Sequence, residues 1–396
     1  MYYRLDNEEI INYVKNSTNL FSKKEKLSSE EISDGNLNLV FRVKSSDNNR
    51  SVIIKQSLPS LRIDETMKLC LERIDLEYKY LTYIKNIQPK LVPEVYHFDK
   101  KMKVIIMEDL YSHEVLRNIL IQGIKSKNIG SEVGSFLAKS LFFTSDLYLE
   151  QLKKKRLVKD FINPELCKIT EDLVFTQPYY ECEKNNIDPW LMPKVKEIIG
   201  DEELKKSVAK LRYKFMNNSA SLLHGDLHTG SIMVNKDGVK IIDGEFAFFG
   251  PMGFDIGAFI ANIILNYLSQ EVHMEEVDSR KEYKEYLRTI ILDTWNKFES
   301  EFRMLWSEFI QCPLEATDEY MNEYIQEVFE DTIGYAGCKM IRRIYGLAHV
   351  SDIDSIIDKK AKEKVQNKAL DLGRELIVKR KEFYNINNLI EKVTMY

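Results

Sequence analysis

Apolar residues in the first quarter of the chain fall in short runs that are typical of β-strands. The runs 36–44 and 51–56 are rich in β-branched side chains, and the polar stretch 45–49 between them predicts a turn, so together they predict a hairpin. Two further short runs, 92–98 and 102–107, are joined by the polar residues 99–101. Between the two pairs, residues 62–87 carry apolar side chains three and four positions apart, the period of an amphipathic helix. This order predicts a small antiparallel sheet with one helix on it.

The pattern changes after Tyr111, where longer helical periods begin. Residues 119–148 and 204–215 show the helical spacing, and it resumes from about residue 268 to the end with strongly charged faces. We therefore expect an N-terminal part over residues 1–110, a linker at about 108–111, and a mostly helical part over 112–396. The fold class predicted from this division is α+β.

The composition is that of an ordinary globular protein. The 396 residues are 44% hydrophobic and 30% charged, and the formal net charge of −5 offers no general attraction to a nucleic-acid backbone. The longest apolar stretch, 254–268, is interrupted by Asp255, Asn262 and Asn266 and is shorter than the roughly 20 residues that span a bilayer. No signal-peptide pattern opens the chain, and the five cysteines are scattered without a C-x-x-C pair. We expect a cytoplasmic protein that binds neither nucleic acid nor membrane.

Candidate chemistry concentrates between residues 222 and 257, where glycines cluster. The apolar runs 231–234 and 239–242 flank a turn sequence, which predicts a second hairpin. That hairpin would bring Asp243 back towards the start of the segment, so we expect Asp226, Asp243 and Glu245 to converge. Such a carboxylate cluster is tolerated when a hard cation such as Mg²⁺ neutralises part of it.

A metal with one carboxylate left over is the arrangement used for phosphoryl transfer, in which the free carboxylate accepts the proton of a hydroxyl. We assign that task to Asp226. Lys55, in the strand sequence VIIKQ, is the candidate that would hold the α and β phosphates of ATP. Glu77, on the helix that follows, could pair with Lys55.

These residues resemble the protein-kinase-like small-molecule kinases, which include the aminoglycoside and choline kinases. The resemblance is carried by His224, Gly225 and Asp226, followed by a hairpin and Asp243. The chain departs from that pattern in three ways: the turn 34–38 has a single glycine, Ser231 stands where asparagine is expected, and Asp243 is followed by Gly-Glu instead of Phe-Gly.

The carboxylate of Glu245 can replace the amide ligand that is lost at Ser231, so the site stays complete. The last two departures are also features of a narrower family. The sequence is similar to the 5-methylthioribose kinases in four blocks, at 34–43, 107–110, 224–259 and 339–350. The resemblance implies a two-lobed protein-kinase-like fold and transfer of the γ-phosphoryl group of ATP to the 1-hydroxyl of 5-methylthioribose, giving 5-methylthioribose 1-phosphate in methionine salvage. It also implies a Mg²⁺ cofactor and a homodimer.

Site residues follow from the resemblance by position. Asn38 would lie in the loop that covers the phosphates, and the backbone of Glu108, Asp109 and Leu110 would meet adenine. Asp226 would be the base, next to the bound sugar. The remaining carried-over residues are Asp243 and Glu245 as Mg²⁺ ligands, Gly244 between them where members of that family more often have proline, and Arg342 and Arg343 facing the sugar.

Several of these residues have alternative readings. Lys55 could be an exposed lysine that protects a sheet edge, and the carboxylate segment could be a polar surface hairpin. Arg342 and Arg343 could form buried salt bridges. Asp255 is expected to cap its helix or to accept backbone hydrogen bonds from the catalytic loop.

Two other functions remain open from the sequence. The first is a kinase for another small hydroxylated substrate such as an aminoglycoside or choline, although tandem arginines suit a neutral sugar better than a cationic substrate. The second is a nucleotide-binding scaffold without activity, which would usually have lost the base or a metal ligand.

Overall fold

The computed structural model describes residues 2–32, 38–48, 50–60 and 68–396. They form two compact units, one of Met1–His113 with Lys240–Ala247 and the other of Glu114–Val239 with Phe248–Tyr396. The lobes expected at 1–110 and 112–396 stay a prediction.

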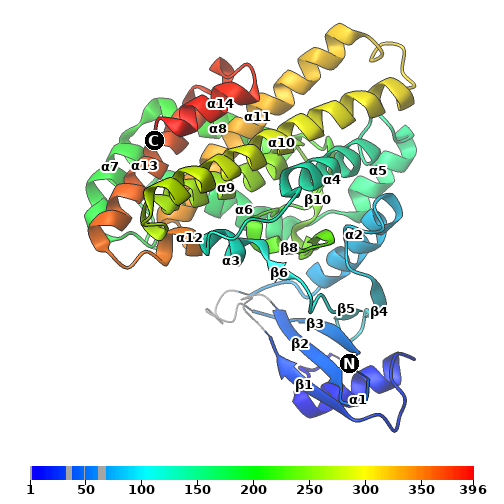
Figure 1. The fold of residues 1–396 in the computed structure, drawn as a ribbon. Helices are drawn as coiled ribbons and strands as arrows, with labels where there is room; N and C mark the ends of the chain where they lie inside the picture. Colours follow the sequence, from blue (N-terminus) through cyan, green and yellow to red (C-terminus); the bar gives the residue numbers. More distant parts are fainter. Residues whose placement is uncertain (1, 33–37, 49, 61–67) are drawn as a thin grey trace. The chain divides into compact units, whose positions relative to one another are not determined.

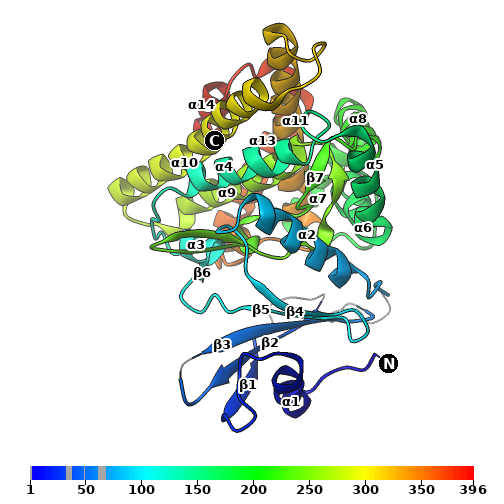
Figure 2. The same ribbon diagram turned by 90° about the vertical axis from the view of Figure 1, so that its right-hand side faces the viewer.

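The first unit is built on a five-stranded antiparallel sheet with the strand order β1-β2-β3-β5-β4. Figures 1 and 2 show helix α1 on one side of this sheet and α2 on the other. The expected hairpin and the two further short strands are present, whereas α1 and β1 were not predicted. The elements are α1 (Asn7–Ser17), β1 (Leu27–Glu31), β2 (Asn38–Ser45), β3 (Ser51–Ser57), α2 (Arg73–Ile87), β4 (Val95–Asp99) and β5 (Val104–Glu108).

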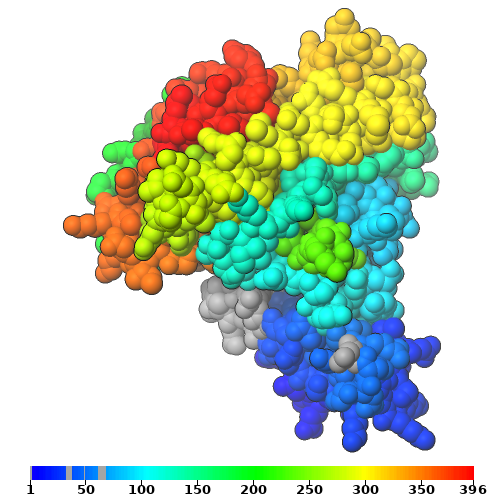
Figure 3. Space-filling view, viewed as in Figure 1, coloured from blue at the N-terminus to red at the C-terminus, as the bar shows by residue number. Residues whose placement is uncertain are grey.

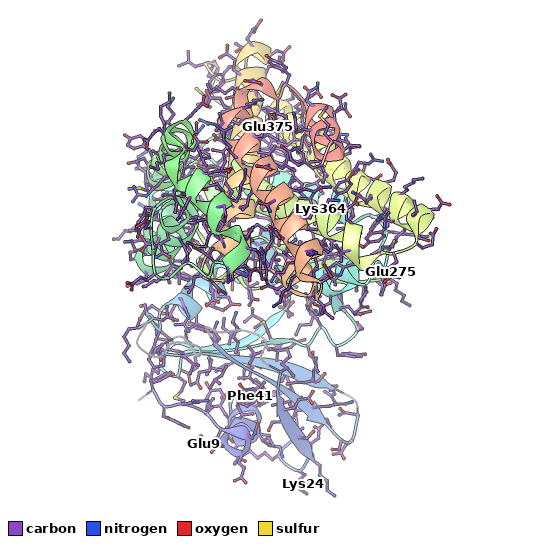
Figure 4. All side chains as sticks on the ribbon, turned by 90° about the vertical axis from the view of Figure 1, so that its left-hand side faces the viewer. Glu9, Lys24, Phe41, Glu275, Lys364 and Glu375 are labelled. Carbon is purple, nitrogen blue, oxygen red and sulfur yellow. The ribbon has the colours of Figure 1, made fainter. Side chains whose placement is uncertain are left out.

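The core of this unit lies between α1 and the sheet. Ile10 and Val14 of α1 are buried with Phe41, which Figure 4 labels, and with Ile54 of β3. The start of α1 is fixed by a capping box, in which Asp6 and Glu9 satisfy each other's backbone N–H groups. Alternating apolar residues on β2 and β3 therefore pack one face of the sheet against α1, and α2 lies on the other face.

Helix α2 is shorter than its sequence period predicts. The expected helix ran from 62 to 87; residues 61–67 lie outside the described residues, Lys68 forms a β-bridge with Ser60, and the helix begins only at Arg73. The side chain of Arg73 donates hydrogen bonds to the carbonyls of Leu58 (2.9 Å) and Cys70 (2.7 Å). These bonds fix the described residues just before Arg73, 68–72, outside the helix, which apolar spacing alone does not reveal.

The second unit is mostly helical, and its first helical stretch is interrupted. The expected helix 119–148 is two helices, α3 (Leu116–Ile121) and α4 (Ile129–Phe143), preceded by the two-residue strand β6 (Glu114–Val115). The break contains Gly123 with φ of 73° and Asn128 with φ of 61°. Positive φ is incompatible with a right-handed helix, so the expected continuous helix was wrong there.

Long helices form the core of the second unit. Helix α9 is buried along most of its length, and at Gly257 it approaches α11 so closely that a Cβ would meet the carbonyl of Thr332. The helices are α5 (Gln151–Asp160), α6 (Pro164–Phe175), α7 (Met192–Gly200), α8 (Glu202–Asn217), α9 (Gly253–His273), α10 (Val277–Phe309), α11 (Asp318–Tyr345), α12 (Ser351–Asp354), α13 (Lys359–Val378) and α14 (Ile386–Thr394). In the part of the chain that the structure describes, none of the helices has both the length and the apolar character for crossing a bilayer.

The C-terminal helix α14 packs on the surface of this unit. Figure 3 shows it in red beside the yellow α10. Glu375 of α13, labelled in Figure 4, bonds to Lys392 of α14 at 2.9 Å and to the hydroxyl of Tyr396 at 3.2 Å. The end of the chain is therefore tied to α13.

Short strands frame the glycine-rich segment. Strands β8 (Ile232–Asn235) and β9 (Gly238–Ile241) form the expected hairpin, and β7 (Ser221–Leu223) pairs antiparallel with β10 (Phe248–Gly250). The pairing of β7 with β10 places His224 and its neighbours directly at the end of a buried strand. These residues open the loop that carries Asp226.

Candidate active site

Lys55 lies on β3, in the middle of the sheet, and only 3% of its surface is exposed. Its Nζ atom lies 2.9 Å from Glu77 Oε1 and 2.5 Å from Asp243 Oδ1. The expected pairing with Glu77 is confirmed, and the reading of Lys55 as an exposed edge lysine is wrong. Burial alone would lower the pKa of Lys55, but Asp243, Glu77 and Glu245 outweigh it and raise that pKa, so the ammonium keeps its charge.

Glu245 is held by a residue that the sequence did not single out. Its Oε2 atom lies 3.2 Å from Arg73 Nε and accepts a hydrogen bond from Asn38 Nδ2 at 3.0 Å. Arg73 also donates to Asn38 Oδ1 at 2.9 Å, which closes a buried triad. Arg73 and Glu77 are four positions apart on α2 and therefore share one helix face, and this spacing could have indicated Arg73.

The segment that carries Asp243 and Glu245 has an unusual backbone. Asp243 has φ of 64° and ψ of 46°, the left-handed conformation, and a short 3₁₀ helix over Gly244–Phe246 follows it. Gly244 packs against the ring of buried Tyr80 on α2, so closely that a Cβ at position 244 would collide with ring atoms. A glycine thus stands here because an aromatic ring occupies the space of a side chain.

Asp243 and Glu245, two residues apart, are the expected metal ligands. The Asp243 side chain is 47% exposed, whereas that of Glu245 is 6% exposed and already engaged by Arg73. Among the described residues, no three His, Cys, Asp or Glu side chains gather into a set that could hold a metal ion. A pair still fits Mg²⁺, because this ion commonly takes one or two protein carboxylates and completes its shell with phosphate oxygens and water. The metal roles of Asp243 and Glu245 stay predictions.

The expected adenine linker has side chains with structural partners. Glu108 Oε2 lies 2.9 Å from Lys240 Nζ, and Asp109 receives two hydrogen bonds from Arg42, at 2.8 and 3.2 Å. These contacts fix the path of the chain up to Leu110. The predicted contact with adenine involves the backbone of Glu108, Asp109 and Leu110 and stays a prediction.

In the second unit, Asp255 shapes the loop that carries Asp226. The carboxylate of Asp255, 2% exposed at the start of α9, accepts the backbone N–H groups of His224 at 2.6 Å and Gly225 at 3.0 Å. Gly225 has φ of 85°, which suits glycine. The predicted role of Asp255 as an acceptor for the catalytic loop is confirmed.

The two histidines of this loop accept backbone hydrogen bonds through their Nδ1 atoms. His224 Nδ1 lies 3.3 Å from the amide of Asp226, and His228 Nδ1 accepts from the amide of Gly230 at 3.0 Å. Burial lowers the pKa of His228 well below its ordinary value, so it is neutral and carries its proton on Nε2, 3.5 Å from Asp226 Oδ2. Both histidines therefore support the loop through their Nδ1 atoms.

Asp226 is paired with Lys339 of α11, another residue that the sequence analysis did not select. Lys339 Nζ lies 2.8 Å from Asp226 Oδ1 and 4.6 Å from the centre of the Phe254 ring. Burial would raise the pKa of Asp226, but the positive charges of Lys339, Arg343 and Arg342 hold it well below its usual range. The carboxylate is ionised. Lys339 is the first residue of the segment 339–350 that carries the family resemblance. It lies one helical turn before Arg342 and Arg343, and this spacing could have indicated it as a site residue.

Arg342 and Arg343 follow on the same helix. Their Nη1 atoms donate to the carbonyls of Ala348 at 3.4 Å and His349 at 3.3 Å. Within the described ranges no carboxylate lies at salt-bridge distance from either arginine, so the structure gives no support to their reading as a buried salt bridge. Their Nε atoms are buried without a hydrogen-bond partner. Asp226, Arg342 and Arg343 belong to one unit and Asp243 and Glu245 to the other, so the convergence of all three carboxylates stays a prediction.

Comparison with known proteins gives a consistent result. Residues 168–288 match the model of the phosphotransferase enzyme family, a range that includes Asp226, Asp243 and Glu245. The chain is 42% identical over 362 residues to a methylthioribose kinase of Geobacillus sp. (strain WCH70), covering 91% of this chain and 88% of that protein. The chain belongs to the methylthioribose kinase family. A second member, from Yersinia pseudotuberculosis, is 39% identical over 368 residues, covering 93% of this chain and 90% of the relative.

The fold of this methylthioribose kinase family member is also found in a more distant protein. The structure of a choline kinase from Cryptosporidium parvum aligns over 98% of both chains with a TM-score of 0.51 at 16% identity. At that identity the likeness shows the fold alone. The expected kinase-like fold, with an antiparallel N-terminal sheet followed by a mostly helical part, and the expected family are both confirmed.

Proposed function

We propose that this chain is an ATP-dependent 5-methylthioribose kinase that transfers the γ-phosphoryl group to the 1-hydroxyl of the sugar. The observation that carries the proposal is its similarity to methylthioribose kinases over nine-tenths of its length. The contacts of the site residues support it, because each unit holds charged groups of the kind that phosphoryl transfer requires.

The first unit supplies the nucleotide side of the site. Lys55 is charged, buried and fixed by Glu77, so its ammonium is suited to hold the α and β phosphates. Asn38 would contact the phosphates, and the backbone of residues 108–110 would contact adenine. Asp243 and Glu245 would hold Mg²⁺, which when bound neutralises phosphate charge.

The second unit supplies the acceptor side. Asp226, ionised and anchored by its loop, would accept the proton of the 1-hydroxyl as the sugar oxygen forms its bond to the γ-phosphorus. The bond between that phosphorus and the bridging oxygen breaks, and ADP leaves. Arg342 and Arg343 would bind the sugar hydroxyls and the negative charge that develops on the phosphoryl oxygens.

The positive charge around Asp226 also discriminates between acceptors. Lys339, Arg342 and Arg343 outnumber the single carboxylate that they surround, and a cationic substrate such as choline or an aminoglycoside would be repelled there. A neutral sugar that leaves as a phosphate ester fits this field. This observation favours the proposed substrate over the cationic alternatives.

The test is a coupled assay of ADP release with purified protein, ATP and Mg²⁺. We expect turnover with 5-methylthioribose and much less with ribose, choline or kanamycin, and no turnover after chelation of the metal. Asp226→Asn should lose orders of magnitude in kcat with ATP binding nearly intact. Preferred turnover of another acceptor would refute the substrate, and nucleotide binding without any turnover would indicate the scaffold.

The assembly state is a separate part of the proposal. We propose a homodimer because the family resemblance implies one. Light scattering on the purified protein at several concentrations measures the mass directly, and a mass of 46.5 kDa at all concentrations would identify a monomer instead.

A further inference from the structure

Lys339 has a position that the proposed roles of its neighbours do not explain. It lies on α11, is 4% exposed, and its Nζ is 2.8 Å from Oδ1 of Asp226. The second carboxylate oxygen, Oδ2, is 3.5 Å from His228 Nε2, a distance longer than an ordinary hydrogen bond. One oxygen of Asp226 is therefore bound firmly, and among the described residues the other has a loose partner in His228.

The Lys339 ammonium is itself held on two sides. It packs 4.6 Å from the centre of the Phe254 ring on α9, and the ring face attracts a cation. Phe254 directly precedes Asp255, whose carboxylate holds the backbone of the loop that carries Asp226. The start of α9 thus fixes both the loop and the cation that binds its carboxylate.

We propose that Lys339 is a positioning residue that binds Oδ1 of Asp226 and so presents Oδ2 to the acceptor hydroxyl. This inference rests on the proposed function of Asp226 as the proton acceptor. Without Lys339 the carboxylate could rotate about its Cβ–Cγ bond, and the fraction of molecules with the correct geometry would fall.

Lys339 also acts on the charge of Asp226. The groups that face Asp226 are Lys339, Arg342 and Arg343 from α11 and His228 from its own loop; Arg117 of α3 acts on it from further away. An ammonium at 2.8 Å favours the ionised carboxylate and makes it a weak base. A weak base suits phosphoryl transfer, in which the hydroxyl proton can leave late and the carboxylate mainly orients the nucleophile.

The chain provides a matched control in Lys154 of the same unit. Lys154 is 2% exposed, lies 2.7 Å from Asp146 Oδ2, and sits 5.0 Å from the centre of the Phe249 ring. Lys154 is therefore as buried as Lys339 and also has a carboxylate and a ring as partners, without any contact to Asp226. It differs in that the Asp146 side chain is 65% exposed and that Lys154 Nζ also donates to the carbonyl of Ala220 at 2.6 Å. A loss caused only by removing a buried lysine would appear equally in Lys154→Met.

The experiment compares Lys339→Met, Lys339→Gln, Lys339→Arg and Lys154→Met in the ADP-release assay over a range of pH. For Lys339→Met and Lys339→Gln we expect kcat to fall about 10-fold to 100-fold, while KM for both substrates stays nearly unchanged. This loss is smaller than that expected for removing the base Asp226 itself, because the base is still present but less well positioned. The acid limb of the profile should move up by about one pH unit or more, because the carboxylate loses its nearest positive charge. Lys339→Arg should restore part of kcat, and Lys154→Met should keep the wild-type profile.

An unchanged kcat and acid limb in Lys339→Gln would overturn the proposal, as would an equal loss in folded Lys154→Met. If Lys339→Met does not fold, Lys339→Gln and Lys339→Arg still decide it. If the wild type lacks 5-methylthioribose kinase activity, the proposed function fails first. The Asp226 carboxyl can then be titrated by ¹³C NMR, with its signal identified by its absence in Asp226→Asn, and an unchanged titration midpoint in Lys339→Gln would refute the electrostatic contact itself.

Discussion

Arg73 and Glu245 form a buried ion pair within the first unit, with Arg73 Nε 3.2 Å from Glu245 Oε2 and both side chains at most 6% exposed. The two residues are distant in sequence, and each would be costly to bury alone. Their pairing explains how the Glu245 carboxylate is tolerated in the interior.

The first prediction concerns this pair. Arg73→Met should lower the free energy of unfolding by about 3–5 kcal/mol, because it leaves the Glu245 carboxylate buried without its cation. Lys85→Met is the control, since Lys85 pairs with the half-exposed Glu94 and should cost about 0–1 kcal/mol. Urea unfolding measures both. If both variants lost the same free energy of unfolding, the buried Arg73–Glu245 pair would contribute no more to stability than the exposed Lys85–Glu94 pair.

The second prediction concerns Gly244 and Tyr80. Gly244→Ala should destabilise the protein by about 1–3 kcal/mol, since the added methyl group collides with the Tyr80 ring. Tyr80→Ala should cost about 3–5 kcal/mol because it leaves a cavity. In the double variant the methyl group enters that cavity, so its cost should be smaller than the sum of the single costs. Strict additivity in the unfolding measurements would exclude this contact as the reason for glycine.

A third prediction tests the anchoring of the catalytic loop. Asp255→Asn replaces one acceptor oxygen by an NH₂ group that faces a backbone N–H, so we expect a loss of about 1–3 kcal/mol in stability. The loop that carries Asp226 should lose its geometry, and kcat should fall more than the KM for ATP rises. Steady-state kinetics on the folded variant provide the measurement. If Asp255→Asn kept the kcat of the wild type, Asp255 would not be needed for the geometry of the loop that carries Asp226.

The fourth prediction is a pH dependence of stability. Burial raises the pKa of Asp331 on α11 from its ordinary 3.8 to about 6, although Lys214 at 2.8 Å opposes the shift. Because the folded protein holds this proton more tightly than the unfolded chain, the contribution of Asp331 is fully present below about pH 4 and is lost as pH rises through 6. The span from 3.8 to about 6 corresponds to about 3 kcal/mol.

Asp331→Asn removes this titration. We expect the wild type to lose about 3 kcal/mol relative to the variant between pH 4 and pH 7. Unfolding curves of the two proteins at a series of pH values test the expectation. A constant difference between them across that range would mean that Asp331 keeps an ordinary pKa in the folded protein.

The sequence predicted the local elements around the site well and the long-range side-chain pairs poorly. The β8–β9 hairpin and the strand with Lys55 follow from turn residues and apolar runs, which are local signals. The Lys55–Glu77 pair could be proposed because a helix follows the strand in the chain. The contacts of Arg73 with Glu245 and of Lys339 with Asp226 join residues more than 100 positions apart, and no spacing rule reaches that far.

The two failed helix boundaries have local causes that periodicity does not record. The start of α2 is delayed because Arg73 binds carbonyls upstream of it, and the stretch after α3 is broken by positive φ at Gly123 and Asn128. The apolar spacing of the sequence continues across both places, before Arg73 and between α3 and α4. Hydrogen bonds and backbone conformation decided the outcome against that pattern.

The division of the chain places Lys240–Ala247 with the first unit although the residues on both sides of it belong to the second. A fragment that ends at His113 would therefore keep Lys55 and Glu77 but lack Asp243 and Glu245, leaving both Lys55 and Arg73 without carboxylates that they bind in the whole chain. The same holds for chimaeras: an exchange of N-terminal units between relatives at a single junction would separate residues that contact each other in this chain, such as Tyr80 and Gly244. Chimaeras between members of this family should be most stable and most active when the eight residues Lys240–Ala247 come from the same parent as the sheet.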